Sequence, residues 1–327
     1  MFKKNLYLIV IFSMLTGQTT VNPNISAIGD LILSHDESST TFSNSGLELA
    51  FQGYVNPFAR ANVFIHKHDS EEPTALEEAF LSVDRGLPLG LQIRAGRMRP
   101  EFGRLNREHS HLWPYILPST PMQKILGPEL WSGVGLELRY LLPFPWFSNI
   151  TLGIFQNGIE LSEEEETSTL DNTDHPSAIN MRWSNFLDFS DITHGELGIS
   201  LYQSDGENLM GLDYKLKWRP DTYRSLSLKG DIFFRKGEGD TTAIVGLSVI
   251  NAQFSRIWNL GATIDYFHQE DQSSYASVGG FLGFSPAAES SVLRFMVKRI
   301  FHEGGDDSWQ LVSQLIWSLG PHKPHKF

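Results

Sequence analysis

The sequence contains no cysteine, carries more acidic than basic residues, and has no long apolar run after its first twenty residues. Without cysteine, the 327-residue chain cannot form disulfides, thiolate metal sites, a cysteine nucleophile or a lipid anchor on an N-terminal cysteine. The formal net charge of −12 argues against a nucleic-acid partner, because binding to phosphates requires a basic surface. Motif searches find no Gly-x-Ser-x-Gly, no His-Glu-x-x-His and no P-loop, so we do not expect an enzyme.

The N-terminus has the features of an export signal. Lys3 and Lys4 precede an apolar run from residue 6 to residue 15, and small or polar residues follow. That run is too short for a transmembrane helix, which needs about 20 apolar residues. We therefore predict a cleaved signal peptide at 1–19 and one mature domain at 20–327. The mature chain is expected to be either a soluble exported protein or a barrel in the outer membrane of a Gram-negative bacterium.

The mature chain consists of segments of about ten residues in which apolar and polar residues alternate. In the segment 211–219, Leu212, Tyr214, Leu216 and Trp218 alternate with Asp213, Lys215, Lys217 and Arg219. Such alternation predicts a strand with one apolar and one charged face. A soluble sandwich turns the apolar face inward, whereas a membrane barrel turns it toward lipid.

Three features favour the barrel. The segments are long enough to cross a bilayer as tilted strands. Aromatic residues gather at segment ends, where an interfacial girdle belongs. Polar acidic connections alternate with short ones that carry proline or aromatics. We predict an all-β fold, a transmembrane antiparallel up-and-down barrel of about 16 strands, which would enclose an aqueous channel. The predicted strands centre near Ala27, Phe51, Val63, Phe80, Ile93, Leu138, Ile154, Met181, Leu201, Leu216, Phe233, Leu247, Ile264, Phe281, Phe295 and Leu315.

One connection, at 99–131, is far longer than the others and rich in aromatic and aliphatic residues. A connection of that length is functional or disordered, and its apolar residues argue against disorder. We predict that it folds into the lumen as a constriction or a plug. The candidate pore residues at its start and on the next strand are Arg94, Arg97, Arg99, Arg104, Arg107, Glu101 and Glu137.

The positive charge of these arginines suggests that the channel selects anions, but a structural role is the alternative. Guanidinium groups bind carboxylates and phosphates through paired hydrogen bonds, so arginines at a constriction favour anions. Alternatively, the same arginines pair with Glu101, Glu108 and Glu137 and form a structural network. The sequence alone leaves both readings open.

Three pairs of histidines are candidate metal ligands: His66 with His68, His109 with His111, and His322 with His325. Imidazoles that share one strand face can bind Zn²⁺ or Cu²⁺. A closed site needs a third and a fourth ligand, and the sequence does not show these. The alternative is that these histidines are ordinary polar residues of loops and lumen.

Short motifs resemble a known family. The segment 91–106 (LQIRAGRMRPEFGRLN), the following His109-Ser-His-Leu-Trp-Pro and the tail Gly320-Pro-His-x-x-His-x-Phe resemble Gram-negative outer-membrane porin-like proteins. These are loosely similar to the phosphate-selective porins O and P, and some are labelled zinc-regulated TonB-dependent outer-membrane receptors. The resemblance implies a porin-like barrel. It does not imply energy-coupled transport, because the chain is too short for a 22-stranded barrel with a plug domain.

These observations lead to three functional hypotheses. The first is an outer-membrane channel for passive diffusion of small hydrophilic solutes, with a mild preference for anions. The second is a closed barrel that binds a ligand or zinc and has no channel activity, and the third is an outer-membrane hydrolase. Expected partners are the lipid bilayer with lipopolysaccharide, the barrel-assembly machinery, and small hydrophilic solutes or anions. No cofactor is expected, and a homo-oligomer is left open.

Overall fold

A computed structural model describes residues 23–44, 46–67, 74–116, 119–156, 158–159, 178–204, 206–237, 241–270, 272–287 and 290–320. The predicted signal peptide at 1–19, together with His68, His322 and His325, lies outside these residues.

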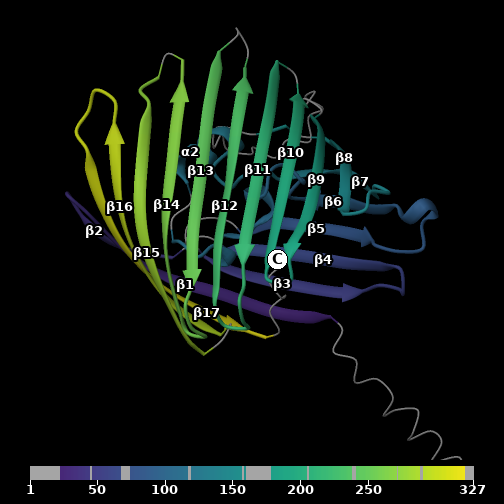
Figure 1. Cartoon of the computed structure of the whole chain (residues 1–327), viewed down its shortest axis with the longest axis horizontal. Helices are drawn as coiled ribbons and strands as arrows, with labels where there is room; N and C mark the ends of the chain where they lie inside the picture. Colours follow the sequence, from purple (N-terminus) through teal and green to yellow (C-terminus); the bar gives the residue numbers. More distant parts are fainter. Residues whose placement is uncertain are drawn as a thin grey trace, which may run out of the picture.

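Antiparallel strands dominate the described chain (Figure 1). Their bounds are β1 (Asn24–Asp36), β2 (Thr40–Ser43), β3 (Leu47–Tyr54), β4 (Ala59–Lys67), β5 (Ala75–Val83), β6 (Gln92–Met98), β7 (Gly133–Leu141), β8 (Phe147–Phe155), β9 (Ala178–Ser190), β10 (Thr193–Ser204), β11 (Glu207–Trp218), β12 (Ser225–Lys236), β13 (Thr242–Gln253), β14 (Trp258–Gln269), β15 (Tyr275–Ala287), β16 (Ser291–His302) and β17 (Ser308–Leu319).

The sheet closes on itself. β1 pairs with β17 over ten residue pairs, from Ala27 opposite Leu319 to Asp36 opposite Gln310. The short β2 and the longer β3 pair one after the other with β1, so together they fill one position in the wall. The result is a closed barrel of 16 antiparallel strands, as predicted. Each of the sixteen predicted centres lies within an observed strand.

Alternation along the strands puts the apolar face outside. On β11, Leu216 is 45% exposed, whereas the inward Asp213 is fully buried. The same pattern holds around the barrel, where large aliphatic and aromatic side chains cover the outer surface. Soluble monomers rarely expose so large a continuous apolar surface. The soluble sandwich considered from the sequence is therefore excluded.

Aromatic residues lie exposed at strand ends, as the sequence indicated. Trp146, Trp218, Trp309 and Trp317 are all among the exposed large side chains. No helix in the described part of the chain is long and apolar enough to span a membrane.

The inner wall differs from the purely polar lumen that alternation alone suggests. Several inward positions on β8 to β17 are buried aromatic or aliphatic residues, among them Phe155, Phe233, Val245, Phe267 and Phe281. They belong to one cluster with apolar residues of the connection between β6 and β7. The barrel therefore has an internal hydrophobic core, and that connection supplies ten of the 23 buried residues in it.

Candidate functional site in the barrel lumen

The connection between β6 and β7, residues 99–132, is called the lumen loop below. It contains the 3₁₀ turns η2 (Leu105–Arg107) and η3 (Ser110–Leu112) and the helix α2 (Thr120–Leu126). Its contacts reach several sides of the barrel. The Gly103 amide donates to Ser200 Oγ on β10 at 2.9 Å, and Arg294 Nη2 on β16 donates to the His111 carbonyl at 3.0 Å.

One side of the lumen loop is packed by aromatic contacts. The Phe102 ring stacks on Phe233 of β12, with centroids 5.2 Å apart and planes 15° apart. Trp131, which is buried, meets Phe155 and Tyr202 edge-on at 5.2 and 4.9 Å. The α2 helix lies against β13 and β14. Burial of side chains this large is the main favourable term that holds the loop against the wall.

Gly103 makes a close approach that only glycine permits. Its φ is +62°, and a Cβ there would lie 2.6 Å from both Asp231 Oδ1 and the Phe233 ring. We expect Gly103→Ala to lower the free energy of unfolding by about 1–3 kcal/mol, because it adds overpacking to backbone strain. Urea unfolding followed by tryptophan fluorescence measures this. Gly90→Ala is the matched control, since Gly90 has φ +69° and nothing within 4 Å of a Cβ. Equal losses in both variants would contradict the close approach.

Asn106 joins the two ends of the lumen loop. Its Nδ2 donates to the carbonyls of Pro100 and Trp131, both at 3.0 Å, and its Oδ1 accepts from the Trp131 amide at 2.8 Å. The side chain is fully buried. A single side-chain amide thus pairs with three backbone groups at the two ends of the loop.

Opposite the aromatic contacts, arginines surround a buried carboxylate. Glu101 of the lumen loop contacts Arg107 Nη1 at 2.5 Å, Arg182 Nη1 at 3.7 Å, and the guanidinium of Arg139. The neighbouring Glu137 on β7 accepts from Arg94 Nη1 at 3.0 Å and from the Glu101 amide at 2.7 Å.

The network continues along β9 to β12. Arg182 Nη2 lies 2.6 Å from Asp213 Oδ1, and Lys229 Nζ lies 2.5 Å from Glu108 Oε2. Arg104 pairs with Glu196, and its amide donates to Asp231 Oδ1 at 2.6 Å. The structural network considered from the sequence is thus present. These arginines pair with lumen carboxylates and backbone carbonyls, and Arg94 also lies over the Phe80 ring at 4.7 Å.

At the centre of this network, the basic side chains are more exposed to solvent than the acidic ones. The side chains of Arg107 and Arg139 are 28% and 27% exposed, whereas those of Glu101 and Glu137 are 1% and 2% exposed. The carboxylates lie behind the guanidinium groups. Farther along, Glu108 and Glu196 are 21% and 20% exposed, more than their partner Arg104 at 9%, so carboxylates reach the solvent there.

The predicted pore residues are distributed over three places. Arg94, Glu101, Arg104, Arg107 and Glu137 belong to the network just described, while Arg99 pairs with Glu77 beside it. Arg97 is a correction. Strand alternation puts it on the outward side of β6, opposite Ala79 and Val134, so it does not line the lumen.

Sequence reasoning did not identify five members of the network, namely Arg139, Arg182, Glu196, Lys229 and Asp231. The sequence feature that could have identified them is the charged face of their strands. That face shows which residues turn inward, but it does not show which of them meet the loop.

A second polar group lies where the lumen loop meets β3 and β5. His109 Nδ1 is 3.0 Å from Glu48 Oε2, and His109 Nε2 is 3.0 Å from Glu78 Oε1. Carboxylates only accept hydrogen bonds, so both ring nitrogens donate and the ring is protonated. Burial alone lowers the pKa of this loop histidine, but the charge of Glu48 and the hydrogen bonds to both carboxylates outweigh it and raise the pKa to about 10.

A β-bulge brings a third carboxylate to this group. The register of β4 with β5 shifts between Phe64, opposite Glu78, and Ile65, opposite Leu76, which leaves Glu77 unpaired in the ladder. Consecutive residues of a regular strand point to opposite faces, but a bulge redirects one of them. Both Glu77 and Glu78 therefore contact His109.

The structure brings together one of the predicted histidine pairs. His109 and His111 have ring centroids 5.6 Å apart, and His111 Nδ1 lies 3.5 Å from Glu48 Oε2. Among the described residues, Glu48, His109 and His111 form the group whose donor atoms could reach one metal ion. His66 stands opposite Glu48 in the strand register but is not part of that group.

Comparison with solved structures identifies the architecture. Over 91% of this chain, the structure is similar to an anion-selective porin from Comamonas acidovorans, with a TM-score of 0.63 and 11% identity across 99% of that chain. This chain has the porin β-barrel fold. The porin barrel is also shared by a loop-deletion mutant of OmpT, an outer membrane protein of Vibrio cholerae (TM-score 0.61, 9% identity, 91% and 99% covered). OprB of Pseudomonas putida is a further example (TM-score 0.58, 13% identity, 91% and 92% covered).

Comparison of the sequence finds only a distant relative. No family model matches the chain. An uncharacterized protein of Aquifex aeolicus (strain VF5) is 24% identical over 309 residues, which cover 79% of this chain. The chain spans 64% of the length of that relative.

Proposed function

We propose that this protein is an outer-membrane channel through which small hydrophilic solutes diffuse passively, with a preference for anions. The observation that carries the proposal is the unequal exposure of charge in the lumen. Arg107 and Arg139 are partly exposed in front of the buried Glu101 and Glu137. A solute that passes this point meets guanidinium groups first, and these attract carboxylates and phosphates.

The outer surface and the fold support the membrane location. A band of exposed apolar side chains with aromatic residues at strand ends matches the environment of a bilayer and its interfaces. Solved structures with the same fold include one described as an anion-selective porin. Barrels of 16 strands are wide enough to enclose water, and the lumen loop would then narrow the path without a second domain.

The selectivity is tested by reversal potentials in planar bilayers under a KCl gradient. We expect the wild-type channel to prefer chloride and the Arg107→Gln variant to shift toward potassium. One charge acts on an ion about 10 Å away with about 0.4 kcal/mol in a water-like medium, a factor of about two. Arg139 and Arg182 remain beside Glu101 in this variant, so the carboxylate keeps cationic partners.

Arg224→Gln is the control for this measurement. Arg224 is exposed in the turn between β11 and β12, where it pairs with Asp221 at 2.5 Å. Its replacement should leave the reversal potential unchanged. The salt on the dilute side should be about 0.1 M, because the screening length is then about 10 Å. A cation-preferring wild type, or equal potentials for wild type and Arg107→Gln, would contradict the proposed anion preference.

A further inference from the structure

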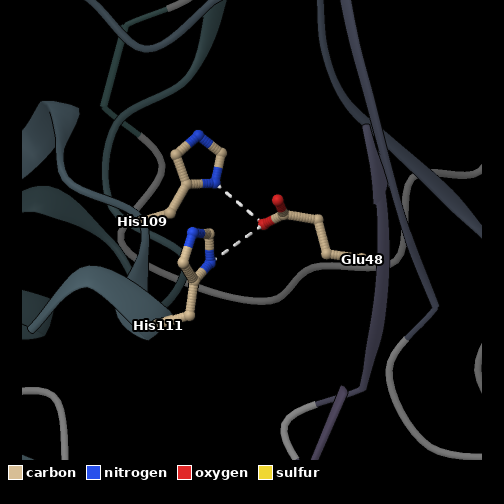
Figure 2. A group of neighbouring side chains, drawn as sticks. All are labelled: Glu48, His109 and His111. Atoms are coloured by element: carbon tan, nitrogen blue, oxygen red, sulfur yellow. Dashed lines mark hydrogen bonds and ion pairs between the residues drawn. The ribbon is translucent and has the colours of Figure 1, made fainter. Parts of the chain in front are cut away.

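Glu48, His109 and His111 come together between the lumen loop and β3 (Figure 2). Glu48 Oε2 lies 3.0 Å from His109 Nδ1 and 3.5 Å from His111 Nδ1, and all three donor atoms lie within 4.8 Å of one another. A tetrahedral ion bound at about 2.0–2.1 Å holds its donor atoms about 3.3–3.4 Å apart. We propose that Glu48, His109 and His111 bind a transition-metal cation of the Zn²⁺ type and thereby tie the lumen loop to the barrel wall.

The ring of His109 is already oriented for such an ion. Its Nε2 bonds to Glu78 Oε1 at 3.0 Å, which leaves Nδ1 facing Glu48. Metal-bound histidines almost always donate their second ring nitrogen to a carboxylate or carbonyl, which fixes the tautomer and the ring orientation. Phe64 packs against the other side of the ring at a centroid distance of 4.8 Å. Binding would replace the Nδ1 proton with the metal.

Glu77 can complete the coordination. Its Oε2 lies 3.7 Å from His109 Nδ1, is buried, and has no hydrogen-bond partner among the described residues. Its other oxygen, Oε1, is held by Arg99. A carboxylate oxygen without a hydrogen bond is costly to bury. A cation between Glu48 and Glu77 would satisfy it, and the bulge that redirects Glu77 is what places it there.

The set of donors selects the kind of ion. Two imidazole nitrogens and two carboxylates suit Zn²⁺ and neighbouring transition metals, whereas Ca²⁺ and Mg²⁺ take oxygen ligands. Three carboxylates face Arg99 and His109 in this group. A dication in place of the His109 proton would balance the negative charge of these three carboxylates more fully. The inference does not depend on the proposed channel activity, because binding is measured without any transport.

Isothermal titration of the purified, folded barrel with Zn²⁺ tests the site. The titration uses the His322→Ala/His325→Ala protein, because the tail histidines could bind zinc on their own. We expect one Zn²⁺ per chain. Glu48→Gln and His111→Ala should each weaken binding by about 100-fold or more. Glu78→Gln should weaken it by about 10–100-fold, the usual effect of a residue that orients a metal-bound histidine.

His194→Ala is the matched control, because His194 pairs with Asp188 at 2.5 Å near the turn between β9 and β10, away from the site. It should bind zinc as the parent does. Absence of binding by the parent would overturn the site. So would a parent-like affinity in Glu48→Gln or His111→Ala, or loss of binding only in His66→Ala/His68→Ala. If Glu48→Gln does not fold, the visible absorption spectrum of the parent protein with Co²⁺ tests the site instead. Intense absorption indicates a tetrahedral site, and its absence overturns the proposal.

Discussion

Replacing Asn106 with alanine is expected to release the lumen loop and to lower the free energy of unfolding by about 3–5 kcal/mol. The substitution removes three hydrogen bonds at once and leaves two carbonyls and one amide of Pro100 and Trp131 buried without that partner. Each such group costs about 1–3 kcal/mol when no water replaces the lost bond. The Pro100 carbonyl keeps the Phe102 amide at 2.9 Å and water can enter the loosened loop, so the estimate lies below three full penalties.

Two readouts separate loop release from general weakening. Urea unfolding gives the loss of stability, and limited trypsin digestion reports access to Arg104 and Arg107, both in the loop. Wild-type protein should resist cleavage there, and Asn106→Ala should be cut. Asn185→Ala is the control, because Asn185 makes one exposed bond, from Trp146 Nε1 at 3.0 Å. A loss in Asn106→Ala no larger than in this control would show that the amide does not hold the loop.

Trp131→Ala is expected to have an effect of similar size through packing rather than hydrogen bonding. The indole is buried against Phe102, Phe155 and Tyr202. Removing a buried tryptophan side chain typically costs about 3–5 kcal/mol, because transfer energy is lost and a cavity remains. The denaturation midpoint in urea should fall accordingly, with the slope unchanged if the barrel still unfolds as one unit.

The control for Trp131 is Trp218→Ala. Trp218 lies on the outer surface at the end of β11 and is largely exposed. Its replacement should cost far less, since it removes interfacial contact and leaves no internal cavity. Equal shifts in the two variants would mean that Trp131 is not packed between loop and wall, and the internal core described above would then be wrong.

Much of the fold follows from local physics that the sequence displays. The alternation of apolar and polar residues predicts the positions of sixteen strands. A strand with one apolar and one charged face must lie between an apolar and a polar environment. The length of the strands and the aromatic residues at their ends indicated which environment lay outside. The apolar composition of residues 99–131 indicated that this segment needed a surface to bury.

The site was less accessible to sequence reasoning, for reasons that are visible at particular residues. Arg97 was grouped with Arg94 by proximity in the chain, although three residues of strand turn it to the opposite face. Glu77 lines the lumen only through a bulge in β5. Glu48 is 61 residues from His109, and only the closure of the barrel brings them together. Contacts across the lumen depend on strand order and stagger, which periodicity does not encode.

The apolar positions on the inner wall illustrate the same limit. Phe233 and Val245 occupy inward positions on β12 and β13, where a lumen filled only with water would favour polar residues. These positions are apolar because Phe102 and α2 of the lumen loop pack against them. An apolar residue on the charged face of a barrel strand is therefore a sequence signal for a packed loop inside, and it was available in the printed sequence.

Single-channel recording of the purified wild-type barrel in planar bilayers tests the central claim most directly. The folded state can be verified beforehand by its slower migration without heating in a detergent gel. The proposed channel predicts discrete conductance steps that are smaller in wild type than in Asn106→Ala, where the lumen loop is released. A folded and inserted wild-type protein that gives no steps, together with an Asn106→Ala variant that does, would mean that the loop seals the barrel and would contradict the proposed diffusion channel.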